Sequence, residues 1–159
     1  MDTRQGYITQ LSISQGGVPK IAISQAVISL EGLEGDRQAN LKYHGGPDRA
    51  VCLWSQDIID QLQADGHPIS AGCAGENITI RGLNWEAIAP GIQLHLGNEV
   101  RLEITDYAAP CRKNMRWFSD RKFGRMSQKQ YPGQSRLYAR VMASGRLRPG
   151  DAVMLVSKT

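Results

Sequence analysis

One of the three cysteines, Cys111, lies at the start of a strongly basic segment. It follows Pro110 and precedes Arg112 and Lys113. Neighbouring cations stabilise a thiolate relative to a thiol, and the thiolate is both the nucleophilic and the metal-binding form of cysteine. Such a sulfur could coordinate a soft transition metal, carry a persulfide or attack an electrophile. Free cysteines more often pack in the interior, so a buried structural Cys111 is the alternative interpretation.

A polar, glycine-rich stretch, residues 32–51 (GLEGDRQANLKYHGGPDRAV), is the second candidate. Paired glycines permit positive φ and let a ligand approach the backbone closely. Asp36 and Arg37 could form a structural ion pair or orient parts of a ligand, and His44 could donate a hydrogen bond or transfer a proton. A surface loop with turn chemistry is the alternative, although long loops inside compact domains are usually functional. The site candidates in this stretch are Asp36, Arg37, His44, Gly45, Gly46 and Arg49.

The basic charge is concentrated in one segment. Residues 111–140 hold nine of the 19 Lys and Arg residues and one acidic residue, Asp120. A concentrated basic segment indicates an anionic partner such as a phosphate, a nucleic acid or an acidic surface. A solvated basic face would have the same composition and is the alternative.

Three arginines and one asparagine could contact a ligand directly. Arginine binds phosphate through two parallel hydrogen bonds, which makes Arg49, Arg136 and Arg140 candidates. Asn77 ends a second glycine loop, residues 71–77. Its side-chain amide offers a donor and an acceptor that could read the edge of a ring.

The overall composition is that of a globular protein. The chain has 159 residues, 41% of them hydrophobic, and a net charge of +4. This length predicts one domain, residues 1–159, with a core of ordinary size. We expect a cytoplasmic protein without membrane association, because no apolar run is long enough for a signal peptide or a membrane span. Three cysteines without a CxxC pair argue against a disulfide framework, and three scattered histidines argue against a zinc site.

The spacing of apolar residues and glycines predicts a mainly β protein. One amphipathic helix is predicted from the N-cap Ser55 to Gly66. Many short strands with one clear helix favour a closed or nearly closed β-barrel. Strands are expected over residues 7–13, 21–30, 50–54, 78–80, 94–105 (a hairpin turning at Gly97 and Asn98), 137–142 and 152–156.

Two segments carry more specific expectations. The basic residues 112–130 contain several aromatic residues and predict an irregular helix. Strict alternation in the first strand assigns its residues to two faces. These faces are Tyr7, Thr9, Leu11 and Ile13 on one side, and Ile8, Gln10 and Ser12 on the other.

Several short motifs recur along the chain in a characteristic order. They are residues 32–37 (GLEGDR), 44–51 (HGGPDRAV), 75–77 (GEN), 110–111 (PC) and 138–141 (YARV), with a closing 150–151 (GD). Together they resemble the MOSC domain, which is found at the C-terminus of molybdenum cofactor sulfurases. The resemblance extends from about residue 7 to residue 156. Tyr43 departs from it, because many relatives carry a second histidine before the His-Gly-Gly.

The resemblance implies a MOSC-type β-barrel with a few short helices that binds the molybdenum cofactor (molybdopterin). Cys111 would be the protein ligand to molybdenum, while the protein otherwise supplies orientation and electrostatics. The basic segment, with Arg112 and Arg140, would hold the phosphate of the pterin. The remaining candidates would line the same pocket, namely Asp36, Arg37, His44, Gly45, Gly46, Arg49 and Asn77.

Two activities follow from the resemblance. Some relatives reduce N-hydroxylated compounds at molybdenum, so we expect a reductase of a small-molecule substrate, with His44 or Asp36 assisting proton delivery. Other relatives deliver sulfur for cofactor maturation, so the alternative is a sulfur carrier with a persulfide on Cys111. Some relatives carry a ferredoxin-like domain, and others carry an aminotransferase-like domain, which is the family's association with pyridoxal phosphate. Neither domain fits in this chain, so a reductase would need a separate electron-donor protein and a carrier would need a separate sulfur-donor protein. A nucleic-acid-binding barrel is a third hypothesis, which the absence of OB-fold or RNA-binding motifs disfavours.

Overall fold

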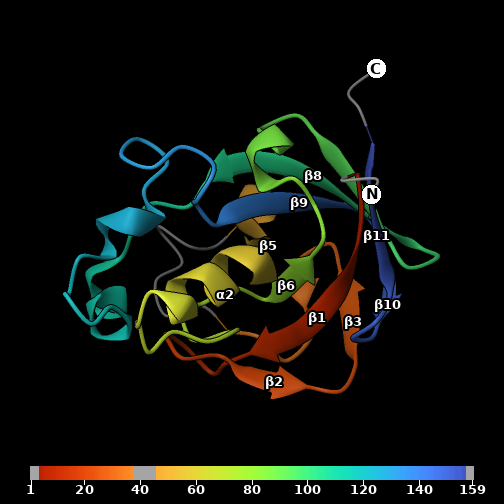
Figure 1. The fold of residues 1–159 in the computed structure, drawn as a ribbon. Coiled ribbons are helices and arrows are strands. Elements are labelled where there is room, and N and C mark those ends of the chain that lie inside the picture. Colours follow the sequence, from red (N-terminus) through yellow and green to blue (C-terminus); the bar gives the residue numbers. More distant parts are fainter. Residues whose placement is uncertain (1–3, 38–45, 157–159) are drawn as a thin grey trace.

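Seven strands close into a barrel in this protein (Figure 1). The structure, a computed structural model, describes residues 4–37 and 46–156. The strands are β1 (Gln5–Ile13), β2 (Ile21–Ile23), β3 (Ala26–Ser29), β4 (Gly32–Leu33), β5 (Val51–Ser55), β6 (Ile78–Arg81), β7 (Gln93–Leu96), β8 (Val100–Tyr107), β9 (Leu137–Ala143), β10 (Gly145–Leu147) and β11 (Ala152–Val156). The helical elements are η1 (Pro47–Arg49), α2 (Gln56–Ala64), η2 (Trp85–Ala87), η3 (Arg112–Trp117) and η4 (Phe123–Met126).

The order of strands around the ring is β11-β7-β8-β9-β5-β6-β1, and β1 pairs again with β11 to close it. Each neighbouring pair is antiparallel except β5 and β6, which run parallel. Parallel neighbours need a long crossover connection, and here α2 and the loop after it provide one. The predicted mainly β barrel with a few short helices is therefore confirmed.

Two smaller pieces of sheet lie outside the ring. The short strand β2 pairs with the far end of β1. A separate three-stranded sheet has the order β10-β3-β4. Its strand β4 leads into the loop that carries Asp36, so this small sheet fixes where that loop begins.

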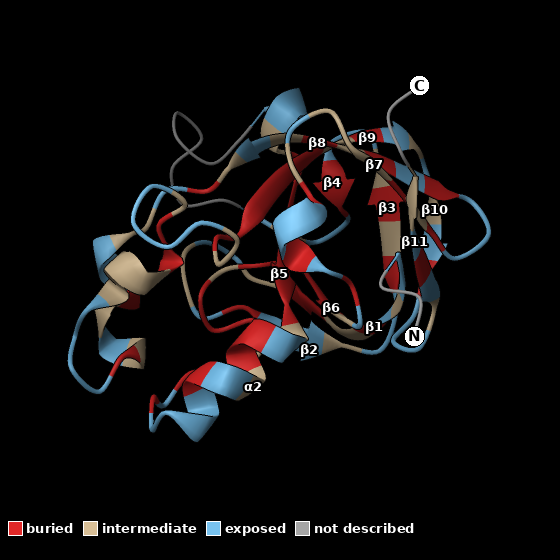
Figure 2. Ribbon diagram, turned by 45° about the horizontal axis from the view of Figure 1, so that its top comes forward, coloured by how far each residue is buried: buried red, intermediate tan, exposed pale blue. Residues whose placement is uncertain are grey.

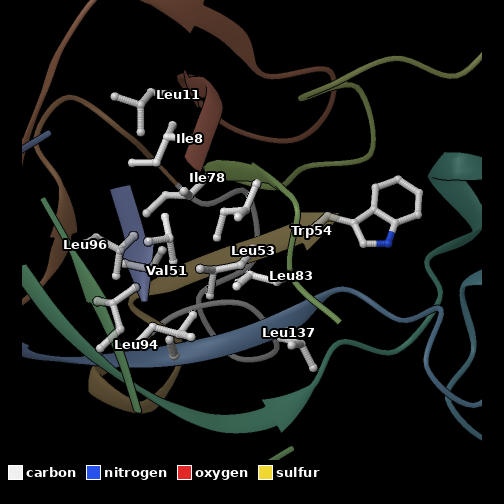
Figure 3. Close-up of a cluster of buried hydrophobic side chains, with 14 of the residues drawn as sticks. Ile8, Leu11, Val51, Leu53, Trp54, Ile78, Leu83, Leu94, Leu96 and Leu137 are labelled. Atoms are coloured by element: carbon white, nitrogen blue, oxygen red, sulfur yellow. The ribbon is translucent and has the colours of Figure 1, made fainter. Parts of the chain in front are cut away.

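The barrel interior is filled by aliphatic side chains from all parts of the chain. Figure 3 shows this cluster, with Trp54 of β5 pointing away from the aliphatic side chains. The Trp54 indole Nε1 donates a hydrogen bond of 2.9 Å to the carbonyl oxygen of Gln134. Because both faces of β5 are covered, all five of its residues are buried (Figure 2). The labelled aliphatic residues are Ile8, Leu11, Val51, Leu53, Ile78, Leu83, Leu94, Leu96 and Leu137.

The strand β1 does not alternate as predicted. Ile8 and Leu11 were assigned to opposite faces, but both are buried in the core. The register with β6 shifts between Ile8 and Gln10. A bulge inserts one extra residue and so reverses the faces of all later residues. Strict alternation was therefore the wrong expectation for this strand.

The predicted single strand over residues 21–30 is also wrong. A bend at Ser24 divides it into β2 and β3, which belong to different sheets. The segment is apolar enough for one strand, but no residue of β2 is buried. The chain leaves the barrel sheet at this bend and starts the small sheet.

The predicted helix and hairpin are confirmed. The Ser55 hydroxyl accepts a hydrogen bond of 3.2 Å from the backbone N–H of Ile58, which caps α2. One face of α2 is buried through Ile58, Ile59 and Leu62 (Figure 2). In the hairpin between β7 and β8, Gly97 has a φ of 59°, a left-handed conformation that favours glycine.

The basic segment after Cys111 forms two short helices, η3 and η4, in place of one irregular helix. They lie at the left of Figure 1, away from the two chain ends. No helix within the described ranges, 4–37 and 46–156, has the length and apolar character needed to cross a membrane.

Candidate functional site

The carboxylate of Asp36 is a buried hydrogen-bond acceptor for three groups. Its Oδ1 accepts from the backbone N–H of Ser14 at 2.9 Å and from Nζ of Lys20 at 2.7 Å. Its Oδ2 accepts from Nδ2 of Asn77 at 2.9 Å. The side chains of Lys20 and Asp36 are 8% and 4% exposed, so this is a buried ion pair. The ion pair ties the loop after β4 to the turn between β1 and β2.

Asn77 connects Asp36 to the strand β5. Its Oδ1 accepts a hydrogen bond of 3.0 Å from the backbone N–H of Cys52. The backbone N–H of Asn77 donates to the Cys52 carbonyl at 2.7 Å. Nδ2 donates also to the carbonyl of Ser12 at 3.2 Å. The amide is thus used within the protein, and its predicted contact with a ring edge stays a prediction.

Cys52 lies beside Tyr138 and Ala108 in a small buried cluster separate from the main core. Cys52 and Tyr138 are paired across β5 and β9. The guanidinium of Arg49 lies 5.0 Å from the centre of the Tyr138 ring, a cation–π contact, and 3.8 Å from the carboxylate of Asp106. Burial raises the pKa of Tyr138, and the nearby thiols of Cys52 and Cys111 act in the same direction.

The three cysteines differ in accessibility. Cys52 and Cys73 are buried, whereas Cys111 is partly exposed. Burial raises the pKa of the Cys52 thiol to about 11, against the opposing effect of the Arg136 charge. Burial likewise raises the pKa of the Cys73 thiol to about 11, although a hydrogen bond from the backbone of Ser70 opposes it. Cys111 is therefore the cysteine best placed to meet a ligand.

Cys111 immediately precedes η3. Its carbonyl oxygen accepts a hydrogen bond of 2.8 Å from the backbone N–H of Asn114. The segment before Cys111 is joined to the loop that ends at Asn77, because the Arg136 side chain donates to the carbonyls of both Ala109 and Ala74. The structure thus connects Asp36, Asn77 and Cys52 by hydrogen bonds, and it ties the segment before Cys111 to the loop that ends at Asn77.

Some other predicted binding residues are exposed and make backbone hydrogen bonds or none that the structure describes. Arg112 is exposed, as is Arg37, whose backbone N–H donates to the Ser14 carbonyl. Gly46 has a φ of 92° and accepts a hydrogen bond from the Arg49 N–H, which closes the turn of η1. His44 and Gly45 lie outside the described residues.

Arg140 has protein partners in this structure. Its Nε and Nη2 donate to Oδ1 of Asp48 at 3.0 and 2.8 Å, and its Nη1 lies 3.8 Å from Glu103. With these acids it lines an open cleft on the outside of β8 and β9. Its predicted contact with a cofactor phosphate stays a prediction, since that contact would compete with Asp48.

Lys20 and Asn114 were missed by the sequence analysis, and Arg136 was considered only as a phosphate ligand. Lys20 follows a turn, and nothing in its sequence context indicates that it is buried beside Asp36. Arg136 is 4% exposed and donates to two carbonyl oxygens. The signal available for Arg136 was its position directly before the predicted strand 137–142, where the end of a buried strand can bury an arginine.

Comparison with known proteins places this arrangement in a family. A model of the MOSC domain family matches residues 40–154. The chain is 31% identical over 147 residues to YflK of Bacillus subtilis (strain 168), which covers 92% of this chain and 65% of that protein. It is 28% identical over 150 residues to YiiM of Escherichia coli (strain K12), which covers 89% of this chain and 64% of that protein.

Two further findings extend the comparison. The crystal structure of YiiM from Escherichia coli superposes with a TM-score of 0.69 at 21% identity, covering 98% of this chain and 71% of that one, which shows a shared fold. A protein named Reductase from Gibberella moniliformis (strain M3125 / FGSC 7600) is 29% identical over 135 residues, 82% of this chain and 23% of that protein. The chain spans about 65% of the length of YflK and YiiM. Because the family match covers most of the residues that build the barrel and the site, the chain belongs to the MOSC domain family, which is associated with molybdenum cofactor binding.

Proposed function

We propose that this protein binds the molybdenum cofactor through Cys111 and reduces N-hydroxylated compounds. The observation that carries the proposal is the accessibility of Cys111 on a segment that Arg136 joins to the loop ending at Asn77. A partly exposed thiol next to a fixed framework is what a single protein ligand to a metal requires. The similarity to a protein named Reductase agrees with this direction.

The residues present fit such a cofactor. Among residues 4–37 and 46–156, no three His, Cys, Asp or Glu side chains form a group that could hold a metal ion. A metal bound to Cys111 would therefore take its other ligands from the cofactor and not from further side chains. The exposed cations Arg112 and Lys113 follow Cys111 directly and would attract the phosphate of the pterin.

The chemistry divides between the cofactor and the chain. When bound, the molybdenum centre supplies the two-electron reduction that cleaves an N–O bond. Two electrons and two protons convert an N-hydroxyl group into an N–H group and water, and a separate donor protein supplies the electrons. The chain holds the site in place: Lys20 and Asp36 fix the loop on one side, and Arg49 covers Tyr138 on the other.

Proton delivery is assigned to His44 or Asp36. Asp36 is held by three donors, which give its carboxylate a fixed orientation. We therefore favour His44 as the proton donor and Asp36 as the group that positions its loop.

The experiment is reduction of an N-hydroxylated base by cofactor-loaded protein with a chemical electron donor. We expect turnover with wild type and with Cys73→Ala, and loss of at least about 100-fold in Cys111→Ser, because the serine hydroxyl is a poor ligand for a soft metal. Equal turnover by Cys111→Ser and wild type would contradict the metal-ligand role. Cys73→Ala is the matched control, since it also removes one thiol but at a buried position.

The second candidate is a sulfur carrier with a persulfide on Cys111. The same accessibility supports it, because a carrier needs an exposed sulfur between two partner proteins. Labelled sulfur that appears on Cys111 in protein without molybdenum, together with no turnover of N-hydroxylated compounds by loaded protein, would favour the carrier.

A further inference from the structure

Arg136 is a buried cation held by backbone carbonyls. It is 4% exposed, and its Nη1 and Nη2 each donate a hydrogen bond of 2.9 Å, to the carbonyl oxygens of Ala74 and Ala109 respectively. Within the part of the chain that the structure describes, no carboxylate lies within 4.0 Å of its guanidinium, and its Nε has no hydrogen-bond partner. This guanidinium therefore joins two loops without forming an ion pair.

Asn114 makes a second connection between the same two loops. Its side chain is fully buried, and Nδ2 donates to the carbonyl oxygen of Ala74 at 3.1 Å. Its backbone N–H donates to the carbonyl of Cys111 at 2.8 Å. The Ala74 carbonyl thus receives hydrogen bonds from both Arg136 and Asn114.

These contacts join the two halves of the candidate site. Ala74 lies three residues before Asn77, which holds Asp36 and Cys52, and Ala109 lies two residues before Cys111. We propose that Arg136 and Asn114 are positioning residues that clamp the Cys111 segment onto the loop ending at Asn77. The inference rests on the proposed function for its purpose, because a fixed thiol matters most if Cys111 is the ligand to molybdenum.

The chemistry of the two side chains supports a positioning role. A buried charge without an ion-pair partner is costly, and apolar residues of similar volume often serve stability better. The planar guanidinium offers donors in a rigid fork, so one side chain can hold two carbonyls at a fixed separation. A lysine keeps the charge but presents it as a single flexible group, and it cannot reproduce this geometry.

The test measures the placement of Cys111 without any cofactor. In apo-protein, the alkylation rate of Cys111 is followed by peptide mass spectrometry. The hydrogen exchange of the Asn114 backbone amide is followed in parallel. The variants are Asn114→Ala, which removes one contact of the clamp, and Arg136→Lys, which keeps its charge. The control is Ser55→Ala, which loses the cap of α2 and is destabilised, but keeps every hydrogen bond of the clamp.

We expect Asn114→Ala and Arg136→Lys to alkylate Cys111 at least about fivefold faster than wild type, because the released segment exposes the thiol. The Asn114 amide should exchange faster in Arg136→Lys, while Ser55→Ala behaves as wild type in both measurements. Rates within about twofold of wild type in folded Asn114→Ala would overturn the clamp. An equal increase in Ser55→Ala would also overturn it, since general loosening would then explain the result.

The two proposals fail in different ways. If Arg136→Lys does not fold, Asn114→Ala decides the question alone. We expect Asn114→Ala to fold, because Arg136 is intact in that variant and still donates to the Ala74 carbonyl. If wild type produced together with the cofactor-synthesis pathway holds no molybdenum, but the clamp variants expose Cys111, the clamp stands and the proposed function fails. If wild type holds molybdenum and the clamp variants leave Cys111 unchanged, the proposed function stands and the clamp fails.

Discussion

At the scale of single residues, the site depends on which groups are buried and which are accessible. Three cysteines share one chain, but two of them are desolvated and one is partly exposed. Desolvation disfavours the charged thiolate, so burial alone makes Cys52 and Cys73 poor nucleophiles and poor metal ligands at neutral pH. Cys111 is accessible because it lies outside the barrel, between β8 and η3.

Selective modification tests this contrast. At about pH 8, a thiol with a pKa of about 11 holds only about a thousandth of its population as thiolate. We therefore expect iodoacetamide to alkylate Cys111 at least about tenfold faster than Cys52 or Cys73 in the folded protein. Peptide mass spectrometry over a time course measures the three rates. Comparable rates at all three positions would contradict the assigned accessibilities, and denatured protein is the control in which they should converge.

The ion pair between Lys20 and Asp36 is the second feature at this scale. Both side chains are almost fully buried, and removing one partner of a buried pair leaves an uncompensated charge. We expect Lys20→Met to lower the free energy of unfolding by about 3–5 kcal/mol, measured by urea denaturation. Lys113→Met, at an exposed position, should change it by less than about 0.5 kcal/mol. A similarly small effect of Lys20→Met would show that the pair does not hold the Asp36 loop.

The sequence pointed to some site residues and not to others for physical reasons. Cys111, Asp36 and Asn77 stand beside glycines, a proline or cations, and these local signals are visible in one dimension. Lys20 and Asn114 act through contacts with residues far away in the chain, so no local pattern marks them. Tertiary burial decides their roles, and burial is a property of the fold.

At the scale of elements, the loop between α2 and β6 is held by a buried carboxylate. Glu76 Oε2 accepts hydrogen bonds from the Gly72 N–H at 2.9 Å and from the Thr79 hydroxyl at 3.0 Å. Its Oε1 is buried without a partner. Burial raises the pKa of Glu76, although these hydrogen bonds and the charge of Arg136 oppose the shift.

The raised pKa of Glu76 predicts how the stability of the fold depends on pH. Because the folded state binds the Glu76 proton more tightly than the unfolded state, Glu76 stabilises the fold most at acid pH. The stabilisation is lost as the pH rises from the ordinary pKa of 4.5 through the higher pKa of the folded protein. Glu76→Gln keeps a neutral side chain at every pH. We expect the Tm of wild type minus that of Glu76→Gln to fall between about pH 5 and about pH 8. A difference that rises over this range would contradict the raised pKa.

Elements with local signals were predicted, whereas a bulge and a strand division that depend on pairing were not. The N-cap at Ser55 and the turn at Gly97 are local, and both the helix and the hairpin were confirmed. The bulge in β1 and the division of residues 21–30 depend on partner strands, so single-sequence periodicity gave the wrong faces and one strand too few. Among the described residues the strand β10 pairs only with β3, and it went unnoticed for the same reason.

At the scale of the whole molecule, the candidate site lies on the outside of a closed barrel. The interior of the ring is aliphatic, and Cys52 faces outward from β5 toward Tyr138. Loops from different parts of the chain carry Asp36, Asn77 and Cys111, and hydrogen bonds join these loops to one another. A site built on loops over a rigid barrel can be positioned well while still admitting a large cofactor.

The most direct test of the account is the molybdenum and pterin content of protein co-expressed with an intact cofactor-synthesis pathway. Wild type and Cys73→Ala should each hold about one molybdenum and one pterin per chain, because neither lacks the ligand. Cys111→Ser should hold almost no molybdenum while its circular dichroism and Tm remain those of wild type. Molybdenum at the wild-type level in Cys111→Ser, or in none of the three proteins, would contradict a cofactor site with Cys111 as the ligand.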